Sequence, residues 1–256
     1  MLLAIDAGNT NIKLGLFQGP ELLANWRLTS DRQRPADEYG SELRGLFDNA
    51  GINVADVEAA IIASVVPQLN DTLKLMLERY LQLTPVFVDH TTKTGLKILY
   101  DQPAELGVDR IVSAVAAVEK YGAPCIVVDF GTATTFNAIN SRREYLGGII
   151  APGIMTSAEA LFSRAAKLPR VSIERPKNVI GRSTVEAMQS GIFYGYGNLV
   201  DGLLEDMLHA MQETPRVIAT GGLALVIADA LHFIHEFDPN LTLDGLRIVY
   251  QMNSRA

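Results

Sequence analysis

Two short segments of the chain share one pattern, and their spacing constrains the fold more than any other feature. Asp6 and Asp129 each end an apolar run, Gly8 and Gly131 follow two residues later, and hydroxyl or amide side chains come next. The segments lie about half of the 256 residues apart, which fits two similar domains of ordinary size. Because a glycine turn exposes backbone N–H groups that an anion can approach, we expect both turns to face one ligand that carries phosphate.

The predicted elements come in a similar order in the two halves. Tight turns join three strands at the start of each half and helices follow, which predicts two α/β domains with mixed sheets. The strands expected in the first half are residues 2–6, 12–17, 22–28, 59–65 and 86–88, and the helices are 36–50 and 67–81. The strands expected in the second half are residues 125–130, 134–140, 145–151 and 217–220, and the helices are 153–164 and 184–211. A helix over 104–121 should join the halves, a loop should span 163–182, and a further helix should follow Gly221 and Gly222 directly.

The chain is acidic, with a formal net charge of −7 and a pI near 5.1, and it has no run of basic residues. A nucleic-acid surface needs clustered Lys and Arg, so this class of partner is not expected. The single cysteine, Cys125, lies in an apolar run and is expected to be buried in a strand. No apolar stretch approaches the ~20 residues of a membrane helix, and the N-terminus does not fit a signal peptide. We therefore predict a cytoplasmic protein that does not bind membranes.

The first turn carries the groups that a phosphate site needs. Asn9, Thr10 and Asn11 can donate hydrogen bonds and Lys13 can add positive charge. Asp6 can hold magnesium through water, since Mg²⁺ keeps much of its hydration. A plain hairpin turn is the alternative, and the similar turn at the middle of the chain favours the phosphate site.

The second turn is rich in hydroxyl groups. Thr132 can donate to phosphate, and Asp129 offers a hard oxygen ligand for a cation. Thr134 and Thr135 fit the same use, but threonine is also a favoured strand residue, so both can be structural. Later in the chain, Gly221–Gly222 would let a nucleoside lie against the backbone, although strand-to-helix turns commonly contain glycine.

These three glycine elements resemble those of the superfamily of acetate kinase, sugar kinases, Hsp70 and actin, in which two ribonuclease-H-like domains clamp ATP. The segment 100–110 (Tyr-Asp-Gln-Pro-Ala-Glu-Leu-Gly-Val-Asp-Arg) resembles the substrate motif of type III pantothenate kinases, and 146–153 is similar to the segment after their second phosphate turn. The resemblance covers nearly the whole chain, with Val108 standing where the family often has alanine. It implies an actin-like ATPase fold with a cleft between domains 1–114 and 115–256.

The resemblance also implies the activity, which is ATP-dependent phosphorylation of pantothenate to 4′-phosphopantothenate, the first step of coenzyme A biosynthesis. Asp109 would be the general base, Asp129 would bind K⁺ or NH₄⁺, and Mg²⁺ would accompany the nucleotide. The residues implied for ATP are Asp6, Ala7, Gly8, Asn9, Thr10, Asn11, Ile12, Lys13 and Thr132. The residues implied for pantothenate are Tyr100, Gly107, Val108, Asp109, Arg110 and Thr184.

By the same resemblance, Thr184 would complete the pantothenate site from the neighbouring subunit of a homodimer. Gly191 and Gly195 lie four residues apart, so a second helix could approach this segment closely. The alternative is a helix buried in the core of one subunit.

Two other functions are consistent with the sequence. Some relatives are described as accessory factors for transcription, so the chain could be a nucleotide-binding regulator, and a kinase or phosphatase of another small alcohol is also possible. Taken without the surrounding motif, Asp109–Arg110 would be read as a surface pair on a helix; the motif favours the substrate site instead. His232 and His235 lack the pattern of a zinc site, and no P-loop motif is present.

Overall fold

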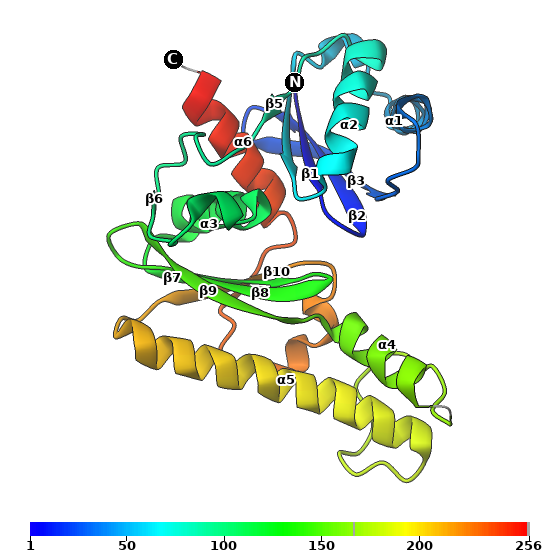
Figure 1. Ribbon diagram of the computed structural model, residues 1–256, viewed down its shortest axis with the longest axis vertical. Helices are drawn as coiled ribbons and strands as arrows, with labels where there is room; N and C mark the ends of the chain where they lie inside the picture. The colour runs from blue at the N-terminus through cyan, green and yellow to red at the C-terminus, as the bar shows by residue number, and fades with distance from the viewer. Residues whose placement is uncertain (166, 255–256) are drawn as a thin grey trace. The chain divides into compact units, whose positions relative to one another are not determined.

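The computed structural model describes residues 1–165 and 167–254, which form two compact units (Figure 1). Unit 1 contains residues 1–95, 101–116 and 241–254, and unit 2 contains residues 96–100 and 117–240. Each unit is built on one mixed sheet. None of the helices in the described part of the chain is long and apolar enough to cross a membrane.

The sheet of unit 1 has five strands in the order β3-β2-β1-β4-β5. Hairpins make β1, β2 and β3 antiparallel, whereas β4 and β5 run parallel to β1 after helical crossovers. The strands are β1 (Leu2–Ala7), β2 (Asn11–Gln18), β3 (Glu21–Thr29), β4 (Ala59–Ser64) and β5 (Val86–Phe87). The helices are α1 (Ala36–Asn49), α2 (Pro67–Tyr80), α6 (Leu241–Ser254) and the first part of α3 (Val108–Tyr121), with 3₁₀ helices at Val54–Asp56 and Pro103–Glu105.

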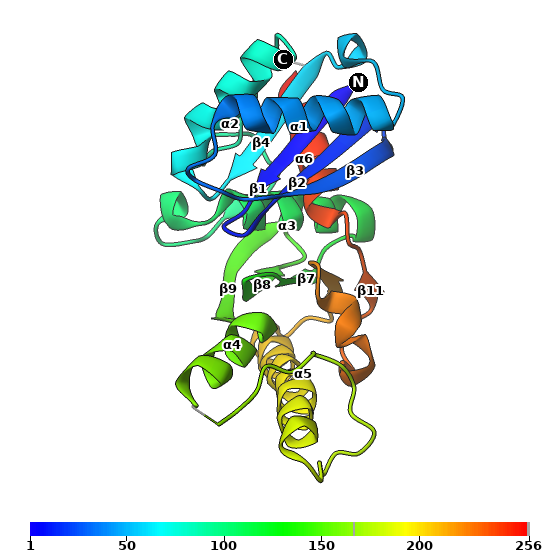
Figure 2. The ribbon, with the colours of Figure 1, turned by 90° about the vertical axis from the view of Figure 1, so that its right-hand side faces the viewer.

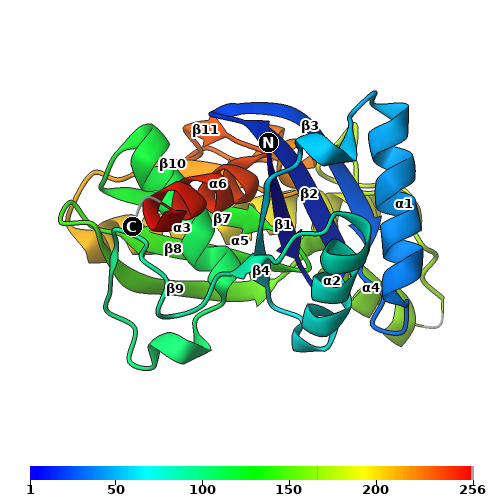
Figure 3. The same ribbon diagram turned by 90° about the horizontal axis from the view of Figure 1, so that it is seen from above.

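Helices cover both faces of the unit 1 sheet (Figures 2 and 3). Leu3 and Ile5 point to one face of β1, where they join a buried cluster with Tyr39 of α1 and Leu73 of α2. Helix α6 packs on the other face, against β1, β2 and β4. Burial on both faces explains why β1 is apolar at every position up to Asp6, which is itself 6% exposed.

The sheet of unit 2 repeats the same arrangement with one extra edge strand, in the order β11-β10-β7-β8-β9-β6. Strands β7, β8 and β9 are antiparallel, whereas β10 runs parallel to β7 and β11 parallel to β10. The strands are β6 (Lys97–Ile98), β7 (Cys125–Phe130), β8 (Ala133–Ile139), β9 (Glu144–Pro152), β10 (Arg216–Thr220) and β11 (Glu236–Phe237). The helices are α4 (Ile154–Arg164), α5 (Thr184–Met211) and the 3₁₀ turns Ala224–Val226 and Ala228–Ala230.

Helix α5 lies along one face of this sheet (Figure 1). Phe193 and Val200 of α5 are buried in one cluster with residues of β7, β8 and β10. The helix begins as a capping motif, because the Ser183 hydroxyl accepts the Glu186 N–H at 3.2 Å. The glutamate carboxylate reaches back to the N–H of Arg182, at 2.8 Å, one residue earlier than a standard capping box predicts.

The helix predicted directly after Gly221 and Gly222 is wrong. Two single-turn 3₁₀ helices occupy that segment instead. The Asp201 carboxylate on α5 accepts the backbone N–H of His232 at 3.1 Å and so holds the end of the segment. The chain then returns to the sheet as β11.

The start of the joining helix also differs from expectation. Helix α3 begins at Val108 rather than near 104, after the 3₁₀ turn at Pro103–Glu105. The C-terminal helix α6 returns to unit 1, so the compact units do not coincide with the ranges 1–114 and 115–256. Those ranges, and the cleft between the two domains, stay predictions.

Candidate active site

The first turn joins β1 to β2 and places a cation beside its aspartate. Asp6 and Lys13 are directly opposite in the β1–β2 register. Lys13 Nζ lies 3.3 Å from Asp6 Oδ2, and the Asp6 side chain is only 9% exposed. The ion pair therefore holds a positive charge at the strand end, next to the turn where a phosphate would sit.

The tip of this turn presents side-chain donors. Asn9 and Thr10 are exposed, while the N–H of Gly8 donates to the Asn11 carbonyl at 3.0 Å and is thus used within the turn. Arg32 Nη2 donates to Asn9 Oδ1 at 3.4 Å. This arginine follows β3, and sequence reasoning missed it because only the pairing of β2 with β3 brings it near the turn.

The segment Gly107–Arg110 forms the start of helix α3. The Gly107 carbonyl accepts the N–H of Arg110 at 3.1 Å, and Asp109 Oδ1 accepts the same N–H at 2.8 Å. Asp109 is half-buried and Arg110 is 8% exposed. Asp109 thus lies in the first turn of a helix, where the helix dipole favours negative charge.

Tyr100 lies in the part of the chain that belongs to unit 2. Its ring meets that of Tyr145 edge to face, with the centroids 6.4 Å apart. The Tyr145 hydroxyl donates to Asn137 Oδ1 at 2.7 Å, and both residues are buried. The predicted substrate residue Tyr100 therefore rests on a fixed aromatic support.

The second turn joins β7 to β8 and has no cation in the position that Lys13 occupies in the first. Asp129 pairs across the strands with Thr135. The N–H of Gly131 donates to the Ala133 carbonyl at 3.2 Å, and Thr132 at the tip is exposed. The turn thus carries one carboxylate among uncharged groups.

Gly221 lies against this carboxylate. In the register of β10 with β7, Thr220 pairs with Asp129, so Gly221 follows at the strand end. Gly221 has φ of +97°, and a Cβ atom there would come within 2.6 Å of Asp129 Oδ1 and of the N atom of Phe130. Both the positive φ and the lack of space for a Cβ atom require glycine here. Gly221, from the glycine pair noted in the sequence, therefore lies against the second turn.

The remaining reactive side chains have structural partners. Burial raises the pKa of the Cys125 thiol to about 12, so this thiol stays protonated. His232 Nδ1 lies 2.6 Å from Asp201 Oδ2, and His235 Nδ1 accepts the N–H of Val217 at 3.1 Å. Among the residues that the structure describes, no group of three or more His, Cys, Asp or Glu side chains could hold a metal ion.

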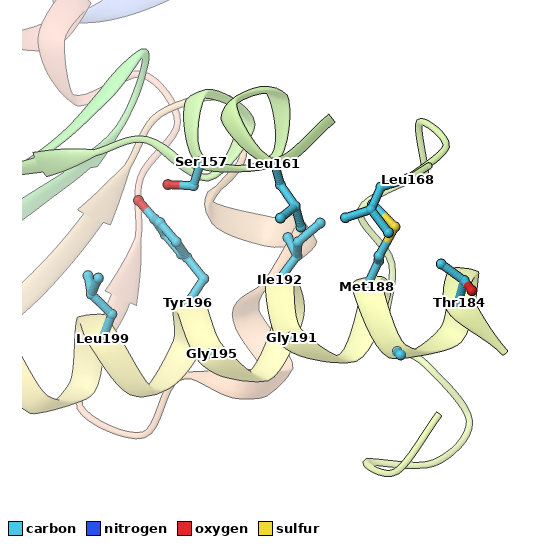
Figure 4. Close-up of a pocket in the computed structure, with 11 residues that line it drawn as sticks. Ser157, Leu161, Leu168, Thr184, Met188, Gly191, Ile192, Gly195, Tyr196 and Leu199 are labelled. Atoms are coloured by element: carbon cyan, nitrogen blue, oxygen red, sulfur yellow. The ribbon is translucent and has the colours of Figure 1, made fainter. Parts of the chain in front are cut away.

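A groove of about 600 Å³ lies between α4 and α5 in unit 2 (Figure 4). Leu161 faces Ile192 across it, and Thr184 lies at its end (Figure 4). Gly191 and Gly195 also line it and are exposed, with nothing within 4 Å of their Cβ positions. The α5 glycines therefore face an open groove, whereas Phe193 and Val200 of the same helix are buried in the core of unit 2.

The predicted site residues divide between the two units. Unit 1 contains the first turn and Gly107–Arg110, and unit 2 contains Tyr100, the second turn and Thr184. Within unit 2, Thr184 is the one candidate site residue among the described residues that line the groove.

Comparison with known proteins decides the family. The family model described as type III pantothenate kinase matches residues 2–206. A type III pantothenate kinase of Halalkalibacterium halodurans is 51% identical over 253 residues, covering 99% of this chain and all of that protein. The chain belongs to the type III pantothenate kinase family. The type III pantothenate kinase of Pelobacter propionicus is 53% identical with the same coverage.

Solved structures support the fold. A protein of Campylobacter jejuni described as a Baf family transcriptional activator matches with a TM-score of 0.63 at 19% identity, covering 99% of this chain and all of that one. The activator of 2-hydroxyisocaproyl-CoA dehydratase from Clostridium difficile, solved with ADPNP, matches with a TM-score of 0.57 at 10% identity, covering 100% and 97%. At such identities the similarity concerns the fold alone, which is that of the actin-like ATPases.

The predictions of family, fold class and activity are thus confirmed. A type III pantothenate kinase is a phosphotransferase that uses ATP to phosphorylate pantothenate, in the first step of coenzyme A biosynthesis.

Proposed function

We propose that Asp109 is the general base with which this pantothenate kinase phosphorylates its substrate. The observation that carries the proposal is the position of Gly107–Arg110, whose sequence matches the substrate motif of the family and which forms the first turn of α3. The helix start favours a charged carboxylate, and Asp109 is half-buried rather than fully solvated. Tyr100, Gly107, Val108 and Arg110 complete the pantothenate pocket in this proposal.

Phosphoryl transfer requires the general base mainly to be correctly positioned. The pantothenate hydroxyl oxygen bonds to the γ-phosphorus of ATP, the bond from that phosphorus to the ADP oxygen breaks, and the hydroxyl proton passes to the Asp109 carboxylate. Because the transition state of phosphoryl transfer is loose, the proton leaves late and orientation supplies most of the rate enhancement.

The first turn, together with Thr132, holds ATP. Lys13 supplies the positive charge, and its ammonium group lies 3.3 Å from the Asp6 carboxylate, whose side chain is 9% exposed. Mg²⁺ would neutralise phosphate charge, and the Asp6 carboxylate is a hard oxygen donor of the type that holds it through water. The residues assigned to ATP are Asp6, Ala7, Gly8, Asn9, Thr10, Asn11, Ile12, Lys13 and Thr132.

Asp129 binds a monovalent cation, K⁺ or NH₄⁺. This assignment is supported by the residue that lies opposite each aspartate in its sheet. Asp129 pairs with the uncharged Thr135, whereas Asp6 pairs with Lys13. A cation held by Asp129 would supply in the second turn the charge that a lysine supplies in the first.

The enzyme acts as a homodimer in the cytoplasm, where ATP is available. A second copy is the occupant assigned to the α4–α5 groove, since its apolar wall carries Leu161 and Ile192 and the exposed glycines Gly191 and Gly195 allow a helix to approach closely. Thr184, at the end of this groove, would then contribute to the pantothenate site of the neighbouring subunit.

The test is the formation of 4′-phosphopantothenate by the purified protein with ATP and Mg²⁺, with and without K⁺. We expect product from the wild type and a kcat about 100- to 10,000-fold lower for Asp109→Asn, the usual contribution of a general base. Nucleotide affinity, measured by titration with a non-hydrolysable ATP analogue, should not change.

The matched control is Glu105→Gln, which removes an exposed carboxylate four residues earlier and should leave kcat unaltered. Unchanged turnover in Asp109→Asn would exclude the base role. Absence of product from the wild type, with and without K⁺, would overturn the proposed function itself.

A further inference from the structure

The start of helix α4 donates two hydrogen bonds to the second turn. The Thr132 carbonyl accepts the backbone N–H of Gly153 at 3.1 Å and the Thr156 hydroxyl at 2.7 Å. A Cβ atom at Gly153 would come within 2.4 Å of this carbonyl oxygen. The approach is therefore close, and the tip of the turn and the first turn of α4 form one hydrogen-bonded unit.

Two donors on one carbonyl fix the orientation of its peptide. A trans peptide places its N–H opposite its C=O, so the N–H of Ala133 points away from α4. The side chain of Thr132 is exposed, on a peptide whose direction these two bonds set. With only one such bond the peptide could rotate at little cost. Nucleotide binding would then have to fix its orientation, and this loss of conformational entropy would lower the affinity.

The following residues of β8 are fixed independently by α5. The Tyr196 hydroxyl donates to the Pro152 carbonyl at 3.1 Å and lies 2.5 Å from Thr134 Oγ1. Since the single phenol proton goes to Pro152, Thr134 is the donor to Tyr196. Burial raises the pKa of Tyr196, which keeps that proton in place. The Thr134 hydroxyl is thus used within the structure of unit 2, whereas Thr132 is exposed at the tip of the turn.

We propose that Thr156 is a positioning residue for nucleotide binding, acting through the Thr132 carbonyl. The inference rests on the proposed assignment of Thr132 to ATP. Thr156 is exposed and acts through a backbone atom, so its effect should fall on nucleotide affinity and leave the pantothenate KM unchanged.

The experiment compares Thr156→Val with Thr156→Ser in the full-length protein. The probe is a non-hydrolysable ATP analogue, and its Kd is measured directly by calorimetric titration. Thr156→Val keeps the shape but loses the hydroxyl, so the Kd should rise about fivefold, the value of one hydrogen bond. Thr156→Ser restores the donor and should bind within about twofold of the wild type. Ser163→Ala is the matched control, since it removes a hydroxyl that bonds to a helix carbonyl at the other end of α4.

An unchanged Kd in Thr156→Val, or an equal loss in Thr156→Ser, would overturn the inference. The same holds if the pantothenate KM rises together with the ATP KM. Thermal unfolding of all three variants separates a general loss of stability from a local effect. A wild type that binds the analogue but does not phosphorylate pantothenate would overturn the proposed function alone, because the Thr156 comparison is read from nucleotide binding.

Discussion

The two aspartate turns occupy the same place in sheets of the same topology, yet their electrostatic environments differ. Asp6 is the last residue but one of β1 and lies opposite Lys13, with 3.3 Å between the charged atoms. Asp129 is likewise the last residue but one of β7 and lies opposite Thr135, with Gly221 against its carboxylate. Equivalent backbone positions therefore face a lysine across the strands in one unit and a threonine in the other.

This difference shows that a repeated fold preserves geometry while the charge at each turn can be supplied in different ways. In the first turn the cation is covalently part of β2. In the second turn, by our proposal, it comes from solution, and the activity consequently depends on K⁺ or NH₄⁺.

The largest effect is expected from a methyl group beside Asp129. In Gly221→Ala the added Cβ would lie 2.6 Å from Asp129 Oδ1 in a backbone with φ of +97°, so the carboxylate and the end of β10 must move. A displacement of this size at a reacting site costs about 100-fold in kcat/KM, and activation by K⁺ should be lost with it. Steady-state kinetics over a series of K⁺ concentrations measure both.

The companion variant is Gly8→Ala in the first turn. Its Cβ would meet only the Asn11 carbonyl, at 3.1 Å, so the loss should be smaller and the response to K⁺ should remain. Equal losses in the two variants would show that the turns are not specialised as we propose.

A lysine in the second turn should make the two turns alike. In Thr135→Lys the new ammonium group stands opposite Asp129, as Lys13 stands opposite Asp6, and cross-strand neighbours are close enough to pair. Activation by K⁺ should then fall to less than about twofold, because the bound cation is replaced by a charge of the protein. Activity is assayed with and without K⁺.

Thr135→Met is the control, since it has similar length without charge and should keep whatever K⁺ response the altered turn retains. If Thr135→Lys still requires K⁺ as the wild type does, Asp129 is not the cation ligand.

The smallest effect concerns the first ion pair. Lys13→Met should raise the ATP KM about tenfold, as expected for loss of a charge-assisted hydrogen bond to phosphate. The free energy of unfolding should fall by more than about 1 kcal/mol, because the variant removes this partner from a carboxylate whose side chain is only 9% exposed. Urea denaturation measures the second quantity. Lys13→Arg keeps the charge and should retain most of the affinity, and an ATP KM unaffected by Lys13→Met would remove this residue from the nucleotide site.

Local patterns predicted much of the fold and located the turns. Asp6 and Asp129 stand out because each follows an apolar strand and precedes a glycine, and such signals lie within a few residues of sequence. The helix predicted after Gly222 failed because a contact from a distant element, the Asp201 carboxylate with the His232 N–H, sets the conformation there.

Long-range contacts of single side chains were beyond prediction. The bond from Thr156 to the Thr132 carbonyl joins residues of two different elements, and an exposed threonine in a helix carries no signal of its partner. The pairing of Lys13 with Asp6 depends on the register of β1 with β2. The return of α6 to unit 1 likewise depends on packing across the whole chain rather than on local pattern.

Helix α4 has two kinds of neighbour. Its first turn holds the Thr132 carbonyl, and its middle forms a wall of the groove through Ser157 and Leu161. Any molecule seated in the groove that shifts this helix would change the affinity for nucleotide, and thermodynamic linkage requires nucleotide to change the affinity for that molecule by the same factor. An inhibitor designed for the groove could therefore weaken ATP binding without resembling ATP, and would not have to compete with the nucleotide pool of the cell.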